Sequence, residues 1–95
     1  MREITYVDAL NEALHEEMQH DKKVIVLGED VELAYVFGAT KGLKDKFGGD
    51  RVRDTPISEL GFVGAAVGAA MVGYRPVVEI MFMDFIMLAM DPLVN

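Results

Sequence analysis

Hydrophobic and polar residues follow two periods along this chain, and the switches between them predict alternating helices and strands. Residues 5–20 carry apolar side chains at helical spacing on one face and glutamates on the other. Short apolar runs rich in β-branched residues are typical of buried strands instead. The predicted elements are, in order, helix 5–20, strand 23–27, helix 40–47, strand 51–57, helix 59–73, strand 75–81 and helix 82–95.

This alternation predicts the fold class. Helices that alternate with strands favour an α/β architecture, in which a layered, mostly parallel sheet is flanked by helices. Chain length sets the scale, because 95 residues form one small domain at most. We therefore expect a single α/β layer structure and no second domain.

Polar residues at the predicted helix starts are typical of caps. Thr5 or Asp8 can cap the first helix, Thr40 the second, and Ser58 the third. Between the first strand and the second helix, residues 31–40 have the pattern of a loop that contains Tyr35. In the last predicted helix we expect the larger apolar side chains to pack inward, namely Phe82, Phe85, Ile86, Leu88 and Met90.

The predicted helix at 59–73 is rich in glycine and alanine, although each glycine costs about 1 kcal/mol relative to alanine in a helix interior. Small residues three and four positions apart allow another backbone to approach closely. The pattern fits equally well with packing inside the domain and with contact to a partner chain, so both interpretations stay open.

Composition and charge exclude several classes of protein. A net charge of −7 leaves no basic surface for nucleic acid, and the absence of cysteine excludes disulfides and thiolate metal sites. The longest uncharged run, 60–74, is short and glycine-rich for a membrane span, and the N-terminal residues do not form a signal peptide. We therefore expect an intracellular protein that binds neither membranes nor nucleic acid.

Two glutamates stand where open α/β sheets place their chemistry, just past the carboxyl ends of strands. Glu59 follows the second strand and begins an apolar helix, so burial would raise its pKa while the helix terminus would favour its ionised form. If the surroundings are dry, desolvation dominates and Glu59 becomes a proton donor near neutral pH. Glu29 follows the first strand, and it is either part of a solvated loop or directed into a cleft.

Several short motifs occur in an order and spacing that resemble a known family. They resemble the N-terminal pyrimidine-binding domain of the beta subunit of thiamine-diphosphate-dependent 2-oxo acid dehydrogenases, which act on pyruvate, branched-chain oxo acids or acetoin. The resemblance covers essentially the whole chain. It is carried by Gly-Glu-Asp-Val at 28–31, Asp-Thr-Pro-Ile-Ser-Glu at 54–59, Gly-Ala-Ala-Val-Gly-Ala-Ala at 64–70, Arg-Pro-Val-Val-Glu at 75–79 and Met-Phe-Met-Asp-Phe at 81–85.

The resemblance implies roles for particular residues. Glu59 corresponds to the catalytic glutamate that hydrogen-bonds to the pyrimidine ring of thiamine diphosphate and promotes proton loss from its thiazolium carbon. Phe85 corresponds to the aromatic side chain that stacks on the pyrimidine, and Ile57 and Met81 correspond to contacts around the ring. Glu29 corresponds to an acid near a water-filled tunnel between two active sites, where it would act as a proton relay.

The resemblance also implies partners and a divided cofactor site. In the family an alpha subunit carries the Gly-Asp-Gly motif that holds the diphosphate and magnesium, whereas residues 48–50 here read Gly-Gly-Asp and form no such motif. We therefore expect an α2β2 heterotetramer with an alpha subunit and a second beta subunit, docked on a lipoyl acyltransferase core. This chain would supply no metal ligand and only the pyrimidine half of the site.

Further expectations concern the whole protein. The chain corresponds to the N-terminal part of a longer beta subunit, is inactive alone, and has the features of a cytoplasmic bacterial or archaeal protein. The substrate stays open among pyruvate, branched-chain oxo acids and acetoin. An alternative of a different class is a non-catalytic docking module of the same fold, which the small-residue helix and the apolar C-terminal segment would favour.

Overall fold

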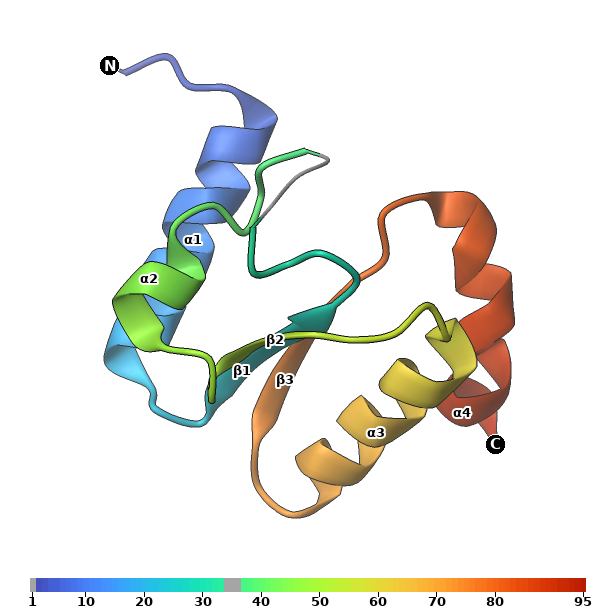
Figure 1. Cartoon of the computed structure of the whole chain (residues 1–95). Coiled ribbons are helices and arrows are strands. Elements are labelled where there is room, and N and C mark those ends of the chain that lie inside the picture. The colour runs from blue at the N-terminus through green and yellow to red at the C-terminus, as the bar shows by residue number, and fades with distance from the viewer. Residues whose placement is uncertain (1, 34–36) are drawn as a thin grey trace.

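The computed structural model describes residues 2–33 and 37–95, in which helices alternate with strands (Figure 1). Residues 34–36, with Tyr35 of the expected loop, lie outside the described residues. The elements are α1 (Tyr6–His20), β1 (Val24–Gly28), α2 (Leu43–Phe47), β2 (Val52–Asp54), α3 (Glu59–Met71), β3 (Arg75–Glu79), the 3₁₀ helix η1 (Met83–Ala89) and α4 (Met90–Val94).

The three strands form one parallel sheet in the order β2-β1-β3, which confirms the predicted α/β class. In the register of this sheet, Gly28 at the end of β1 pairs with Asp54 of β2 and with Glu79 of β3. All three strands therefore end at one edge of the sheet, and the segments that follow them start side by side.

Helices cover both faces of the sheet, with α1 and α2 on one face and α3, η1 and α4 on the other (Figure 1). Alternate residues of β1 are buried, as expected for a strand between two layers. The core under α1 and α2 consists of Met18, Val24, Val26, Val31, Leu43 and Val52. The core under α3 consists of Phe62, Val63 and Ala89, with Val78 and Ile80 of the third strand and its end packed against them.

Two of the predicted helix caps are confirmed. The Thr5 hydroxyl accepts a hydrogen bond from the Asp8 N–H at 3.1 Å, and the Ser58 hydroxyl accepts one from the Gly61 N–H at 3.3 Å. These bonds satisfy N–H groups that the first turn of a helix leaves without partners. Each helix thus begins at the residue that the sequence indicated, and Ser58 places Glu59 in the first turn of α3.

Thr40 does not cap α2, which corrects the predicted start of that helix. The N-cap is Gly42, whose φ of +79° lies in the left-handed region that favours glycine. The Thr40 hydroxyl instead donates to the Val31 carbonyl oxygen at 2.7 Å, in a buried position. The Thr40 hydroxyl is therefore not available to cap α2, and α2 begins three residues later than predicted.

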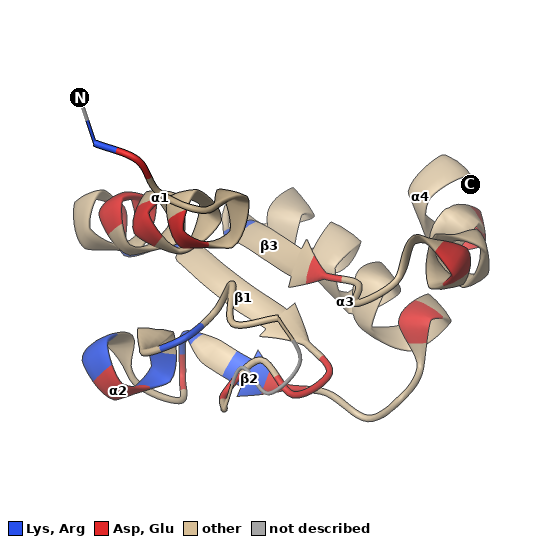
Figure 2. Ribbon diagram, turned by 90° about the horizontal axis from the view of Figure 1, so that it is seen from above, with Lys and Arg blue, Asp and Glu red and all other residues tan. Residues whose placement is uncertain are grey.

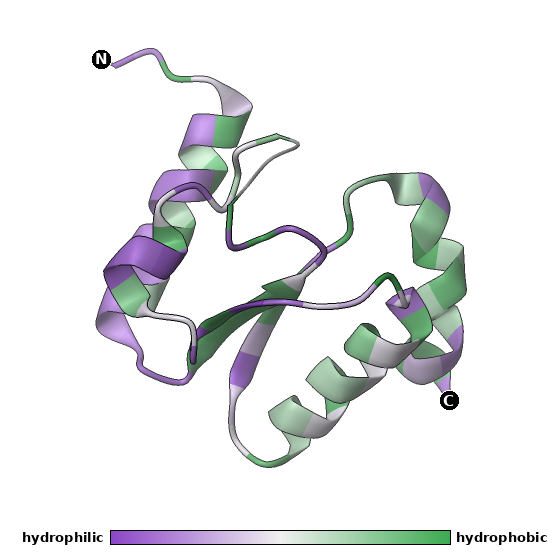
Figure 3. Cartoon of the chain, in the orientation of Figure 1, coloured by the Kyte–Doolittle hydropathy of each residue, from purple (hydrophilic) through white to green (hydrophobic). Residues whose placement is uncertain are grey.

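Hydrophobic residues extend along the whole of α3 and over most of η1 (Figure 3). A Cβ atom built on Gly64 would lie 3.6 Å from the Cβ of Pro92 in α4, so packing inside the domain explains this small residue. A Cβ atom on Gly68 would meet nothing within 4 Å among the described residues. The small-residue pattern therefore serves internal packing at one position and leaves an open surface at another.

The C-terminal segment departs from the predicted single helix. It forms a 3₁₀ helix followed by the short helix α4, and Pro92 lies in the first turn of α4, where its missing N–H needs no partner. The inward packing predicted here is largely wrong, because the buried residue is Ala89. The tighter 3₁₀ turn rotates the larger side chains outward, and the exposed ones are Phe82, Phe85, Leu88 and Met90.

Strand β2 is also shorter than predicted, with three residues instead of seven. Its partner β1 ends at Gly28, opposite Asp54, so the ladder has nothing further to pair with. Pro56 then lies outside the strand, where its lack of an N–H costs no ladder bond. None of the helices within the described residues is both long and apolar enough to cross a membrane.

Candidate functional site

Acidic residues gather at the edge of the sheet where the strands end. Figure 2 shows acidic positions at the ends of all three strands and in the first turn of α3. Asp54 and Glu79 are the last residues of β2 and β3, Glu29 follows β1, and Glu59 begins α3. The parallel register brings these carboxyl groups from four segments of the chain to one edge.

Glu59 is one of the most enclosed polar residues of the domain, with 6% of its surface exposed. Its Oε2 atom is buried and has no hydrogen-bond partner within residues 2–33 and 37–95. The N-terminus of α3 favours a negative charge here, but a buried carboxylate oxygen normally has a donor beside it. A buried oxygen without a partner of this kind is typical of a position that a donor from outside the chain can fill.

Glu29 lies close to Glu59, and its Oε1 atom is likewise buried without a partner among the described residues. Burial raises the pKa of Glu29 above its usual range, and the Glu59 carboxyl raises it further through charge repulsion and side-chain hydrogen bonding. Asp30 adds a smaller repulsion that raises the pKa of Glu29 in the same direction. Glu29 is therefore half-buried beside Glu59, and its role in a cleft stays a prediction.

A third buried oxygen accompanies the two carboxyl groups. The Thr55 N–H donates to the Gly28 carbonyl oxygen at 2.9 Å, which ties Thr55 to the residue before Glu29. The Thr55 hydroxyl oxygen is buried and has no partner in the part of the chain that the structure describes. Carboxylate oxygens and a hydroxyl can together receive the N–H groups of an aminopyrimidine, so the residues present fit such a ring.

The other predicted contact residues differ in their exposure to solvent. Ile57 is 85% exposed and Phe85 is 42% exposed, while Met81 is half-buried. The ring of Phe85 meets the ring of Phe82 edge to face, with the centroids 6.0 Å apart. A flat apolar surface thus stands free to pack against a planar ligand.

Sequence reasoning missed two aromatic residues at this place. Phe82 is predicted to point into the core, yet its ring lies edge to face with that of Phe37 in the loop after β1, with the centroids 5.7 Å apart. Together with Phe85 they form a row that joins the loop after β1 to the start of η1. No local pattern pairs residues so far apart in the chain.

No group of three or more histidine, aspartate or glutamate side chains that could hold a metal ion occurs among the described residues. His15 is instead engaged at the surface, with Nε2 3.2 Å from the Lys41 carbonyl oxygen and its ring beside Phe47. The chemistry that this edge offers is that of buried carboxyl groups, which can hold or transfer a proton.

Fold and site together define a class: a parallel α/β domain that presents buried carboxyl groups at the carboxyl ends of its strands. Comparison with known families then identifies the chain. Residues 2–95 match the transketolase pyrimidine-binding domain, and the chain belongs to this family.

Close relatives come from several kingdoms. The mitochondrial pyruvate dehydrogenase E1 component subunit beta of Dictyostelium discoideum is 50% identical over 99% of this chain and 27% of its own length. The 2-oxoisovalerate dehydrogenase subunit beta of Bacillus subtilis (strain 168) is 48% identical over 100% of the chain and 29% of its own length. The pyruvate dehydrogenase E1 component subunit beta of Rickettsia bellii is 52% identical over 98% of this chain and 29% of its own length.

These similarities confirm the resemblance to beta subunits of 2-oxo acid dehydrogenases. The chain spans less than a third of the length of these relatives, with shares of 27% and 29%. What is established for this chain is its family and fold, and the role of each residue follows as a proposal.

Proposed function

We propose that this chain forms the pyrimidine-binding half of a thiamine diphosphate site in the decarboxylating component of a 2-oxo acid dehydrogenase. The observation that carries the proposal is the buried, unpartnered Oε2 of Glu59 at the carboxyl edge of a pyrimidine-binding domain. Names of the relatives support the reaction class, since they are beta subunits of pyruvate and 2-oxoisovalerate dehydrogenases.

Glu59 would hold the cofactor through a proton shared between its carboxyl group and a ring nitrogen of the pyrimidine. The other residues of the site would orient the ring: Phe85 supplies an aromatic face, and Ile57 and Met81 supply apolar contact beside it. When bound, thiamine diphosphate supplies the carbanion chemistry that decarboxylates a 2-oxo acid before the acyl group passes to a lipoyl group.

The exclusion of water from Glu59 favours proton transfer to and from a bound group over exchange with the solvent. A carboxyl group that is 6% exposed exchanges protons with bulk water less readily than with a donor held against its free oxygen. Glu29 lies beside Glu59, and burial together with the Glu59 carboxyl raises the pKa of Glu29 above its ordinary value, so Glu29 holds a proton more readily than an exposed glutamate. This supports a proton-relay role for Glu29.

The remaining parts of the site would come from other chains. The diphosphate and its magnesium would be held by an alpha subunit, in an α2β2 heterotetramer with a second beta subunit and a lipoyl acyltransferase core. The substrate would be pyruvate, a branched-chain oxo acid or acetoin. Relatives include both mitochondrial and bacterial proteins, and a cytoplasmic location in a bacterium or archaeon stays a prediction.

Replacement of Glu59 by Gln in the intact protein, assembled with its partner subunit, tests this function. The amide keeps the shape but cannot exchange a proton, so we expect kcat for 2-oxo acid decarboxylation to fall about 10²–10⁴-fold. An artificial electron acceptor follows the reaction, and Glu17→Gln on the exposed face of α1 is the matched control. Activity of Glu59→Gln within a factor of about two of wild type contradicts the catalytic role.

A docking module is the second candidate, and one observation favours it. An open apolar groove of about 340 Å³ lies between α3, β3 and α4, lined by Val63, Ala66, Val67, Ala70, Pro76, Val78, Ile80 and Leu93. An apolar groove of this kind is typical of a surface that another segment covers. If Glu59→Gln retains full activity while the assembly stays intact, this second function is the one that remains.

A further inference from the structure

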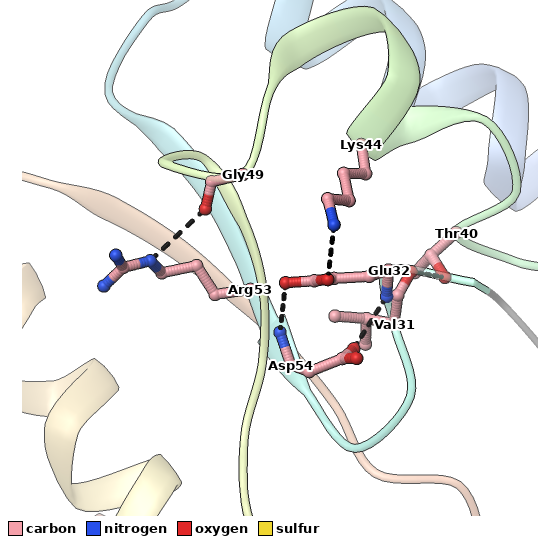
Figure 4. Close-up of polar contacts among 7 residues, drawn as sticks. All are labelled: Val31, Glu32, Thr40, Lys44, Gly49, Arg53 and Asp54. Atoms are coloured by element: carbon pink, nitrogen blue, oxygen red, sulfur yellow. Dashed lines mark hydrogen bonds and ion pairs between the residues drawn. The ribbon is translucent and has the colours of Figure 1, made fainter.

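Reciprocal hydrogen bonds join the turn after β1 to the end of β2 (Figure 4). The Glu32 N–H donates to Asp54 Oδ1 at 2.8 Å, and the Asp54 N–H donates to Glu32 Oε1 at 3.2 Å. The Lys44 ammonium group at α2 donates to Glu32 Oε2 at 2.7 Å. We refer to Glu32, Asp54 and Lys44 as the Glu32 clasp.

The turn that the clasp holds is short and tightly confined. A Cβ atom on Gly28 would lie 2.8 Å from the Glu79 carbonyl oxygen and 2.9 Å from a methyl carbon of Val31, so only glycine fits there. Asp30 adopts a left-handed φ of +56°, a conformation that costs a non-glycine residue free energy. Val31 is fully buried, and Thr40 donates to its carbonyl oxygen.

Glu29 lies inside this turn, and its side chain occupies an unfavourable place. The carboxyl group is partly desolvated and faces a second carboxyl, that of Glu59, with Asp30 adding a third negative charge nearby. Desolvation and like charges each oppose ionisation of Glu29, so an unconstrained turn would rotate the side chain toward water. Some other interaction must therefore hold the turn in place.

We propose that the Glu32 clasp is a positioning device that keeps the Glu29 carboxyl at the edge of the sheet beside Glu59. The clasp fixes the residue three positions beyond Glu29 on two sides, while the β-ladder fixes Gly28 just before it. Its value for cofactor chemistry rests on the proposed function, whereas the position of the carboxyl itself does not.

The charged groups of the Glu32 clasp keep Glu32 ionised, and an ionised Glu32 can hold the turn in place. Hydrogen bonding with Lys44 lowers the pKa of Glu32, and the bond from the Asp54 backbone lowers it further. Glu32 thus stays ionised over the range in which Glu29 takes up and releases its proton. The two glutamates therefore have different roles. Glu32 keeps a constant charge that holds the turn, whereas Glu29 changes its charge.

A titration of Glu29 in the intact protein tests the inference. Glutamate labelled with carbon-13 at the side-chain carboxyl reports each titration midpoint by NMR, and Glu29→Gln identifies the resonance. In Glu32→Ala we expect the midpoint of Glu29 to fall toward its ordinary value, because the freed carboxyl gains water. Lys44→Met leaves both backbone bonds of the clasp in place, so we expect a smaller fall in the same direction.

The control breaks a comparable ion pair at the opposite end of the sheet. Arg75 contacts Asp21 at 3.2 Å where β3 begins, and Arg75→Met should leave the Glu29 midpoint unchanged. If the midpoint stays in place in both clasp variants, or moves as far in Arg75→Met, the clasp does not position Glu29. Circular dichroism confirms folding, and Lys44→Met decides the matter if Glu32→Ala unfolds.

Calorimetry with thiamine diphosphate separates this inference from the proposed function. If the wild-type assembly fails to bind the cofactor while the clasp variants still move the Glu29 midpoint, the proposed function fails and the positioning role stands. If the cofactor binds but the midpoint does not move, the positioning role fails and the proposed function stands.

Discussion

Two carboxyl groups placed together out of water are costly, and Glu29 and Glu59 carry that cost in this domain. Each has an oxygen that is buried without a partner among the described residues, and the Glu59 carboxyl disfavours the ionised form of Glu29. A protein selected for stability alone would replace one of them by an uncharged residue. Their retention at one edge of the sheet is typical of a functional site, where strain is kept for chemistry.

Replacement of Glu29 by Gln should therefore stabilise the intact protein at neutral pH. The pKa of Glu29 is raised in the folded state above its ordinary value of 4.5, so the folded protein holds this proton more tightly than the unfolded chain. The stabilisation is complete below pH 4.5 and is lost as the pH rises through the folded pKa. Above its ordinary pKa, Glu29 costs the folded state free energy, because folding must either bury the charge or keep the proton bound, and Gln removes this cost.

Thermal unfolding between pH 4 and pH 8 measures this effect. We expect Glu29→Gln to melt higher than wild type by a few degrees at pH 7.5, with the difference shrinking as the pH falls. Glu79, whose pKa burial also raises, keeps some of the same pH dependence in the variant. A lower melting temperature for Glu29→Gln at pH 7.5 would show that the carboxylate is stabilised in the fold.

At the scale of helices and strands, the side chain of Arg51 joins three elements. Its guanidinium group donates to the carbonyl oxygens of Met18 at 2.8 Å, Asp21 at 2.9 Å and Val24 at 3.0 Å. It also lies over the ring of Phe47, 5.0 Å from the centroid. A single side chain thereby binds the end of α1, the start of β1 and the last residue of α2.

Arg51→Lys should destabilise the domain by about 1–3 kcal/mol, because an ammonium group cannot reach these carbonyl oxygens together and leaves buried acceptors unpaired. Arg53, two residues along, is exposed and makes one bond, to the Gly49 carbonyl oxygen at 3.3 Å. Arg53→Lys is thus the matched control, with an expected change below about 0.5 kcal/mol. Urea unfolding of the intact protein measures both, and equal effects would contradict the joining role of Arg51.

The elements that sequence alone could predict are those in which local signals agree. Helices α1 and α3 begin at the caps that Thr5 and Ser58 indicate, and apolar runs indicate β1 and β3. Elements set by distant contacts could not be predicted. Thr40 does not cap α2, because its hydroxyl donates to the Val31 carbonyl oxygen. Strand β2 is short because its partner β1 ends at Gly28.

The same distinction holds for the site at the scale of the molecule. Alternation of helices and strands implies that strand ends share an edge, so Glu29 and Glu59 could be placed there in advance. Strand order decides which side chains meet, and no periodicity encodes it. The contact between Glu29 and Glu59, the clasp at Glu32 and the aromatic row through Phe82 therefore became visible only in three dimensions.

Charge and hydrophobicity are divided unequally over the molecule. Polar residues make up much of α1, whereas apolar residues predominate in α3 and η1 (Figure 3). Met71, Val72, Met83 and Met87 are each between 73% and 82% exposed. Large apolar side chains exposed in this number are typical of a surface that another protein covers.

The 95-residue chain on its own should therefore self-associate through this apolar side despite its net charge of −7. Static light scattering over a range of protein concentrations measures the mass, which we expect to exceed that of the 10.5 kDa monomer increasingly as concentration rises. Met87→Lys adds charge to the apolar face and should reduce association, because it would bury an ammonium group in the contact. Gln19→Lys on the polar face of α1 changes net charge equally and should leave association unchanged. A monodisperse monomer at high concentration, or an equal response of the two variants, would show that this face is stable in water and needs no partner.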